Sequence, residues 1–104
     1  MLIFEISKSF PKEEMYSLTD QMRRSSRSTN ICFVEAYRKR KYKAHFISKL
    51  SDSNMENSET KCWLKFALSC KYISIEIYND LSAKSDEVGR LLSNMINNPE
   101  KYGV

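Results

Sequence analysis

Residues 46–70 read FISKLSDSNMENSETKCWLKFALSC, and their spacing is the strongest indication of the fold. Small and apolar residues recur along it at intervals of three and four: Phe46, Leu50, Ser53, Asn57, Thr60, Leu64, Ala67 and Leu68. Such intervals place side chains on one face of a helix. The pattern predicts a helix over residues 42–71, roughly 45 Å in length.

The segment before it, residues 11–38, is predicted to form a second helix of similar length. Pro11 is tolerated in a first helical turn, and Glu13 and Glu14 follow where the helix dipole favours negative charge. The inward seam of this helix is narrow: Met15, Leu18, Met22, Ser25, Thr29, Cys32 and Ala36. Four adjacent like charges at 38–41 separate the two helices, and equal helices joined by a short turn should pack antiparallel.

Residues 72–78 alternate between isoleucine and polar side chains, a pattern that also suits a strand. Because no second such run exists to pair with it, Ser74 is instead predicted as the N-cap of a helix over residues 74–97, closed by Pro99. Residues 1–9 are predicted to form a short helix. The sequence therefore predicts an all-α fold with one domain over residues 1–104, an up-down four-helix bundle with a shortened first helix.

Composition excludes several other classes of protein. Two glycines and two prolines in 104 residues are too few for the turns of a sandwich or barrel, and no phosphate-binding glycine loop occurs. Three cysteines without a CxxC pair, together with one histidine, do not make a zinc site, so no metal or small-molecule cofactor is expected. Free, mostly buried thiols and the lack of a long apolar run favour a cytoplasmic protein with no membrane span.

Positive charge is concentrated in the first half of the chain. Residues 1–52 carry eleven basic and six acidic side chains, whereas residues 53–104 carry six and seven. Basic side chains release counterions from phosphates, and neighbouring tyrosines can stack on unpaired bases. The candidate residues for binding RNA or single-stranded DNA are Arg23, Arg24, Arg27, Tyr37, Arg38, Lys39, Arg40, Lys41, Tyr42 and Lys43. A solvated helix–helix turn would also favour such charges, and that alternative stays open.

Carboxylates also recur at helical spacing, at Glu56 and Glu59. A di-iron bundle would need two Glu-x-x-His pairs, and the only histidine, His45, belongs to no such pair. The antiparallel register instead places Glu56 and Glu59 near the three arginines of residues 23–27, and it places Glu35 at the level of His45. We therefore expect an interhelical ion-pair network and a structural pair between Glu35 and His45.

Arg40 and His45 have an R-x4-H spacing, which resembles the motif of the all-helical HEPN ribonucleases. In such a site the histidine would act as general acid or base, and the arginine would stabilise charge on the phosphoryl group. That family usually has Asn, Asp or His after the arginine, where this chain has Lys41. A HEPN-like ribonuclease is one alternative function.

Three segments carry a broader resemblance: FPKEEMYSLTDQMRRSSRS at residues 10–28, EAYRKRKY at 35–42 and ENSETKCWL at 56–64. They resemble the four-helix-bundle proteins encoded in 23S rRNA intervening sequences, although Cys32 stands where that family usually has Asn. The resemblance implies an up-down four-helix bundle, a ring-like homopentamer and no enzymatic activity. A related branch, the accessory proteins of diversity-generating retroelements, implies a reverse transcriptase or a ribonucleoprotein as partner.

The function expected from the sequence is therefore binding of RNA or a ribonucleoprotein by a non-catalytic, oligomeric helical bundle, through its basic face. The homo-oligomer rests on the resemblance and on the apolar groove that a short first helix would leave for another subunit. A scaffold that recognises only protein is the second alternative.

Overall fold

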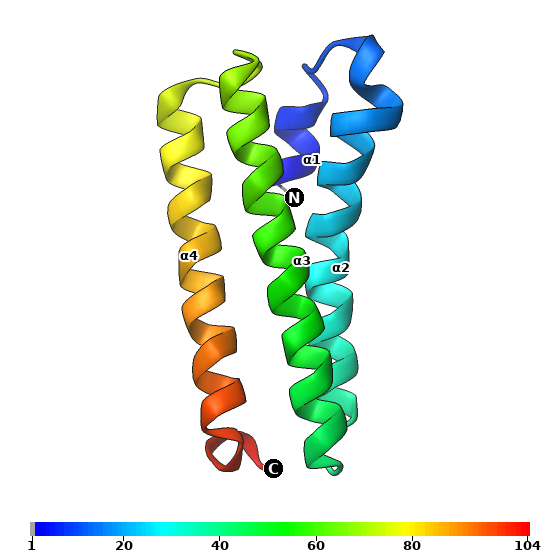
Figure 1. Cartoon of the computed structure of the whole chain (residues 1–104), viewed down its shortest axis with the longest axis vertical. Coiled ribbons are helices and arrows are strands. Elements are labelled where there is room, and N and C mark those ends of the chain that lie inside the picture. The colour runs from blue at the N-terminus through cyan, green and yellow to red at the C-terminus, as the bar shows by residue number, and fades with distance from the viewer. Residues whose placement is uncertain (1) are drawn as a thin grey trace.

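The computed structural model describes residues 2–104 and shows an up-down four-helix bundle with a short first helix (Figure 1). Its helical segments are α1 (Leu2–Ser7), η1 (Lys12–Glu14), η2 (Met15–Thr19), α2 (Asp20–Arg38), α3 (Lys43–Ser69), α4 (Ile75–Asn97) and η3 (Pro99–Tyr102). Among them, η1 and η3 are 3-10 turns and η2 is a π-helical turn. No β-strand occurs within residues 2–104, so the all-α prediction is confirmed there. Met1, predicted to begin the first helix, lies outside the described residues.

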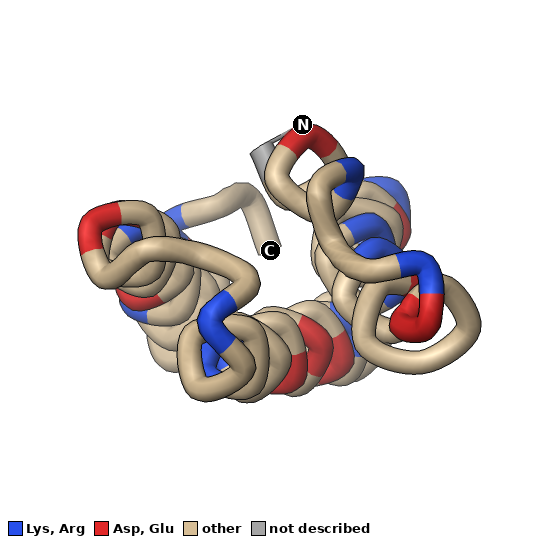
Figure 2. The backbone as a smooth tube through the Cα atoms, turned by 90° about the horizontal axis from the view of Figure 1, so that it is seen from above, with Lys and Arg blue, Asp and Glu red and all other residues tan. Residues whose placement is uncertain are grey.

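The central helix of the bundle is α3. It is flanked by α2 on one side and α4 on the other, and the longest dimension of the molecule is 44 Å (Figures 1 and 2). Seen from above, α1 and the C-terminus lie across the bundle from α3 (Figure 2). Because α1 is only six residues long, it lies beside only the upper part of α2. A hollow of 330 Å³ remains between the four helices.

The buried face of α3 follows the predicted repeat. Its seven buried residues are Phe46, Leu50, Ser53, Asn57, Thr60, Leu64 and Ala67. The predicted helix over 11–38 is regular only from Asp20, and Met15, at the start of its predicted seam, is 44% exposed. This difference arises because the chain enters α2 through a 3-10 turn and a π turn, whose residues per turn differ from those of an α-helix.

The turn between α3 and α4 is made without glycine or proline. Lys71 adopts a left-handed φ of 63°, and the N–H groups of Lys71 and Tyr72 donate to carbonyls of the last turns of α3. The side chain of Ser74 then accepts a hydrogen bond of 3.1 Å from the N–H of Ile77. The N-cap at Ser74 is confirmed, and residues 75–78 belong to α4, so the strand alternative for residues 72–78 is not realised.

The apolar core is divided into two clusters. The upper cluster in Figure 1 contains Phe10, Leu18, Met22, Leu64, Ala67, Ile73 and Leu81. The lower cluster contains Ala36, Phe46, Leu50, Leu92 and Met95. Buried polar residues lie between them along the helices, and we call this layer the polar waist: Ser25, Ser53, Asn57, Thr60 and Ser85.

Hydrogen bonds across the helices satisfy the polar waist. The Thr60 hydroxyl donates to the Ser25 hydroxyl at 2.7 Å, which links α3 to α2. Asn57 Nδ2 donates to the Ser85 carbonyl at 2.9 Å, and the Ser85 hydroxyl donates to Asn57 Oδ1 at 3.0 Å, which links α3 to α4. Because buried polar groups need partners, these bonds favour one register of both neighbours on α3.

The thiols differ from the expectation. Cys32 is half-buried, and this burial raises the pKa of its thiol. Cys62 and Cys70 are exposed, so the prediction of mostly buried thiols is wrong for these two: Cys62 lies off the inward stripe of α3, and Cys70 follows the end of that helix. Within residues 2–104, no helix combines the length and the apolar character that crossing a membrane requires.

Candidate nucleic-acid interface

The turn between α2 and α3 carries the densest run of positive charge. It begins after Arg38, where the Lys39 N–H closes α2 by donating to carbonyls of its last turn at 3.1 Å. The N–H of Tyr42 donates to the Lys39 carbonyl at 2.9 Å, and α3 begins at Lys43. The side chains at positions 38, 39, 41 and 43 are exposed, and the one at 40 is half-buried. A turn this short leaves the charges in water, where their mutual repulsion is weakest.

Both tyrosines of this region are exposed and each contacts a neighbour. Tyr37 is 56% exposed, and the guanidinium carbon of Arg40 lies 4.1 Å from its ring centroid. Tyr42 is 64% exposed, and its ring lies edge-on to the His45 ring with the centroids 5.9 Å apart. An arginine stacked on an aromatic ring keeps its charge and presents a flat surface. The turn therefore offers cations and stacking surfaces together.

A second group of cations surrounds the ring of Phe4 on α1. The guanidinium carbons of Arg23 and Arg27 lie 4.5 and 5.9 Å from the ring centroid, and Lys8 Nζ lies 5.0 Å from it. Lys8 also pairs with Glu5 at 3.3 Å. Cation–π contacts gather these cations without neutralising them. We call Phe4, Lys8, Arg23 and Arg27 the Phe4 cluster.

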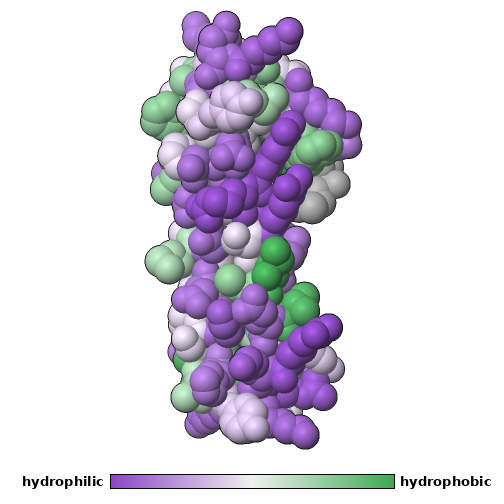
Figure 3. All heavy atoms as spheres, turned by 90° about the vertical axis from the view of Figure 1, so that its right-hand side faces the viewer, coloured by the Kyte–Doolittle hydropathy of each residue, from purple (hydrophilic) through white to green (hydrophobic). Residues whose placement is uncertain are grey.

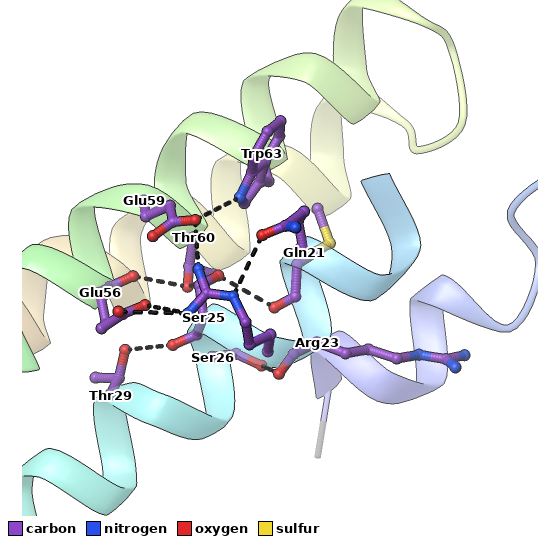
Figure 4. A network of polar contacts seen from close by, with 11 residues as sticks. Gln21, Arg23, Ser25, Ser26, Thr29, Glu56, Glu59, Thr60 and Trp63 are labelled. Atoms are coloured by element: carbon purple, nitrogen blue, oxygen red, sulfur yellow. Dashed lines mark hydrogen bonds and ion pairs between the residues drawn. The ribbon is translucent and has the colours of Figure 1, made fainter. Parts of the chain in front are cut away.

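Arg24 points to the other side of α2 and contacts α3. Its guanidinium contacts Glu56 at 3.2 Å and Glu59 at 2.6 Å, and the Trp63 indole N–H donates to Glu59 at 3.3 Å (Figure 4). The hydrogen bond from Arg24 lowers the pKa of the Glu59 carboxyl, and the same bond raises the pKa of Arg24. Figure 4 shows Arg23 pointing away from these carboxylates. Of the three arginines expected near Glu56 and Glu59, Arg24 alone makes these ion pairs within residues 2–104.

The two groups of cations lie on one edge of the bundle. Arg27 and Arg38 are both on α2, about three turns apart, so they share a helix face and are separated by roughly 16 Å along its axis. Exposed Ile31 and Val34 lie between them on α2. Figure 3 shows this side of the molecule, with hydrophilic side chains above and below a hydrophobic group. We call this surface, from the Phe4 cluster to the turn, the basic edge.

The predicted pair between Glu35 and His45 is wrong. Glu35 contacts Lys49 at 2.8 Å, and it makes no ion pair with His45 within the described chain. Lys49 lies one turn further along α3, and its longer side chain reaches α2, whereas His45 is exposed in the first turn of α3 against Tyr42. Glu35 thus forms an interhelical pair, but with a different partner.

The comparisons with known proteins agree with this architecture. A model of the 23S rRNA-intervening sequence protein family matches residues 1–94. The chain belongs to this family. It is similar to the crystal structure of a protein with unknown function from the S23 ribosomal protein family of Bacteroides thetaiotaomicron VPI-5482, at 29% identity and a TM-score of 0.83. The similarity covers 91% of this chain and 85% of that one, and no curated protein matches.

In this member of the 23S rRNA-intervening sequence protein family, the tertiary structure adds two residues to the candidate interface. Phe4 and Lys8 lie four residues apart on one side of the chain's first segment, with the Lys8 ammonium over the Phe4 ring. From the sequence, residues 1–9 were predicted only to form a short helix. The four-residue spacing of an aromatic and a basic residue was the available signal.

The two residues of the alternative ribonuclease site each contact a different tyrosine ring. Arg40 lies against Tyr37 and His45 lies against Tyr42, and within residues 2–104 no hydrogen bond joins Arg40 to His45. In the same part of the chain, no group of three His, Cys, Asp or Glu side chains is placed to hold a metal ion.

Proposed function

We propose that this family member is a non-catalytic, oligomeric helical-bundle protein that binds RNA, alone or within a ribonucleoprotein, through the basic edge. One observation carries the proposal. Seven cations of the basic edge have no carboxylate partner within residues 2–104: Arg23, Arg27, Arg38, Lys39, Arg40, Lys41 and Lys43. Arg24 is left out of the interface because Glu56 and Glu59 neutralise it.

Unpaired cations grouped on one edge favour a polyanionic partner. Each basic side chain that contacts a phosphate releases a condensed counterion, and this release drives association. Exposed Tyr37 and Tyr42 add surfaces on which unpaired bases can stack. RNA with single-stranded loops fits both features better than a regular duplex.

The test is binding of a labelled, loop-containing RNA measured over a range of salt concentrations. With four phosphate contacts, the logarithm of the binding constant should fall with the logarithm of salt concentration with a slope of about −3. The variant Arg38→Glu with Arg40→Glu should bind at least about tenfold more weakly. The control variant Lys12→Glu with Lys65→Glu changes the net charge by the same amount, at exposed positions far from the turn, and should bind nearly as well as wild type.

Each outcome decides between functions. Absence of binding at low salt, or binding that ignores salt, would overturn RNA binding. Equal losses in the two double variants would show that net charge, and not the basic edge, is responsible. A protein partner that survives nuclease treatment and tolerates Arg38→Glu would support the scaffold. RNA cleavage that His45→Ala abolishes would support the ribonuclease.

The proposal includes a homo-oligomer, with the homopentamer implied by the resemblance as the expected form. Apolar side chains are exposed on two helices outside the basic edge, Met55 and Phe66 on α3 and Val88 and Leu91 on α4. Two different apolar surfaces on one chain suit a head-to-tail contact, which closes into a ring. Sedimentation velocity should show an oligomer that Leu91→Lys dissociates, and a monomeric wild type would overturn this part of the proposal.

A further inference from the structure

The polar waist opens into a cleft between α3 and α4. The cleft has a volume of 440 Å³, and its lining is formed by Asn54, Asn57, Ser58, Lys61, Ser85, Asp86, Gly89, Arg90 and Ser93. Apart from Gly89, every lining residue has a polar or charged side chain, and none is aromatic. We call it the waist cleft. It lies on the α4 side of α3, whereas the basic edge lies on α1, α2 and the turn that follows α2.

Part of this lining is already used by the fold. Asn57 and Ser85 bond to each other through two hydrogen bonds, and Lys61 forms an ion pair with Asp86. Four further lining side chains make no hydrogen bond within residues 2–104: Asn54, Ser58, Arg90 and Ser93. The cleft therefore holds an amide, two hydroxyls and a guanidinium that are available to a ligand.

Gly89 is the glycine of α4, and the bundle itself does not need it. A Cβ atom at this position would lie 3.6 Å from Asn57 Nδ2 and 3.8 Å from Asn54 Oδ1, which are ordinary contacts. Alanine would fit and would favour the helix more than glycine does. What glycine provides is open space at the backbone of α4, on the floor of the cleft.

We propose that the waist cleft binds a sugar phosphate, with Arg90 on the phosphate and Asn54, Ser58 and Ser93 on the sugar hydroxyls. The lining contains two cations, Arg90 and Lys61, and one carboxylate, Asp86, so it carries one excess positive charge. A guanidinium binds phosphate oxygens in a bidentate manner, and amides and hydroxyls bond to the hydroxyls of a sugar. Because no aromatic side chain lines the cleft, a nucleobase would have nothing to stack on.

A sugar attached to a phosphate could reach the cleft from two sources, as a free sugar phosphate or as part of the ribose–phosphate backbone of RNA. Ribose 5-phosphate is the probe for the first, with affinity measured from the amide signals of a ¹⁵N-labelled protein. An open, polar cleft of this kind should bind it with a dissociation constant of about 1 mM. The signals of the Gly89 backbone amide and the Asn54 side-chain amide should shift, and ribose and inorganic phosphate should each bind more weakly.

Three variants test the assignment. Arg90→Gln should weaken binding of ribose 5-phosphate about tenfold. The control Lys65→Gln also removes one positive charge, from a position on α3 outside the cleft, and should leave this binding unchanged. Gly89→Leu should abolish binding by filling the floor. If Gly89→Leu does not fold, Gly89→Ala serves instead, since it fits the helix and should weaken binding while leaving the thermal midpoint unchanged or higher.

The second source is tested with an oligoribonucleotide and its DNA counterpart. If the cleft reads the RNA backbone, Arg90→Gln should weaken RNA binding more than DNA binding, and ribose 5-phosphate should compete with the RNA. If the basic edge does not bind RNA, ribose 5-phosphate should still shift the amide signals of the waist cleft, so each proposal can be refuted without the other. The absence of shifts at Gly89 and Asn54, or equal effects of Arg90→Gln and Lys65→Gln, would overturn the site.

Discussion

The two hydrogen bonds between Asn57 and Ser85 should contribute measurably to stability, because they link α3 to α4 at the polar waist. Asn57 is 9% exposed and makes two hydrogen bonds to Ser85, at 2.9 and 3.0 Å. Asn57→Ala removes both bonds. At about 1 kcal/mol for each bond, it should lower the free energy of unfolding by about 2 kcal/mol. Ser85→Ala removes only the hydroxyl bond and should cost about 1 kcal/mol.

The double variant provides the sharper measurement. Asn57→Ala with Ser85→Ala should cost about 2 kcal/mol and not 3, because the two single changes share one bond, which gives a coupling of about 1 kcal/mol. Urea unfolding followed by circular dichroism measures each free energy, at one fixed protomer concentration because oligomers gain stability with concentration. With an m-value of about 1.5 kcal/mol/M, the midpoint should fall by roughly 1.3 M for Asn57→Ala and 0.7 M for Ser85→Ala.

Two results would refute this reasoning. If the two single effects add without coupling, the hydroxyl bond between Asn57 and Ser85 does not form in solution. If Asn57→Ala changes the free energy of unfolding by less than about 0.5 kcal/mol, the value usual for unconnected surface positions, water already satisfies the waist.

Three further changes probe the ends and the edges of the bundle. Arg24→Gln should cost at most about 1 kcal/mol, since this pair is partly exposed. Because Arg24 lowers the pKa of Glu59 from its usual 4.5, this stabilisation is present above pH 4.5 and lost below it, where the melting temperatures of Arg24→Gln and wild type should converge. Glu14 raises the pKa of Tyr72 from 10.0 to about 12, so the stabilisation by their hydrogen bond is present below pH 10 and lost as the pH rises towards 12. Ultraviolet titration of Glu14→Gln should show one tyrosine ionising at a lower pH than it does in the wild type. Ser74→Ala should lower stability by about 1 kcal/mol, seen as a fall in melting temperature of about 4–8 °C.

The long helices were predictable because their signals are local. The repeat beginning at Phe46 places the buried face of α3, and Ser74 places the start of α4. The entry into α2 was not predictable in the same way. Residues 12–19 form 3-10 and π turns, which differ from an α-helix only in hydrogen-bond register, and no side-chain pattern in this segment distinguishes them.

The candidate interface was predictable in composition but not in arrangement. The cations of residues 23–43 were identified from charge alone, yet neighbouring Arg23 and Arg24 point to opposite sides of α2. Which of them stays available depends on the carboxylates that α3 presents and on the Phe4 ring of α1. The same holds for Glu35, which meets Lys49 because that side chain reaches across where His45 does not.

Local signals in the sequence are sufficient to predict that this chain forms helices, where the long ones lie and which face of α3 is buried, because helix periodicity and capping act between residues three or four positions apart. Which cations are neutralised, and that polar residues from three helices meet in one waist beside a cleft, depends on the packing of the helices. Those properties depend on distances between residues far apart in the chain. Arg24 lies 32 positions from Glu56 and Asn57 lies 28 from Ser85, and only the packing of α2 and α4 on α3 brings each pair into contact.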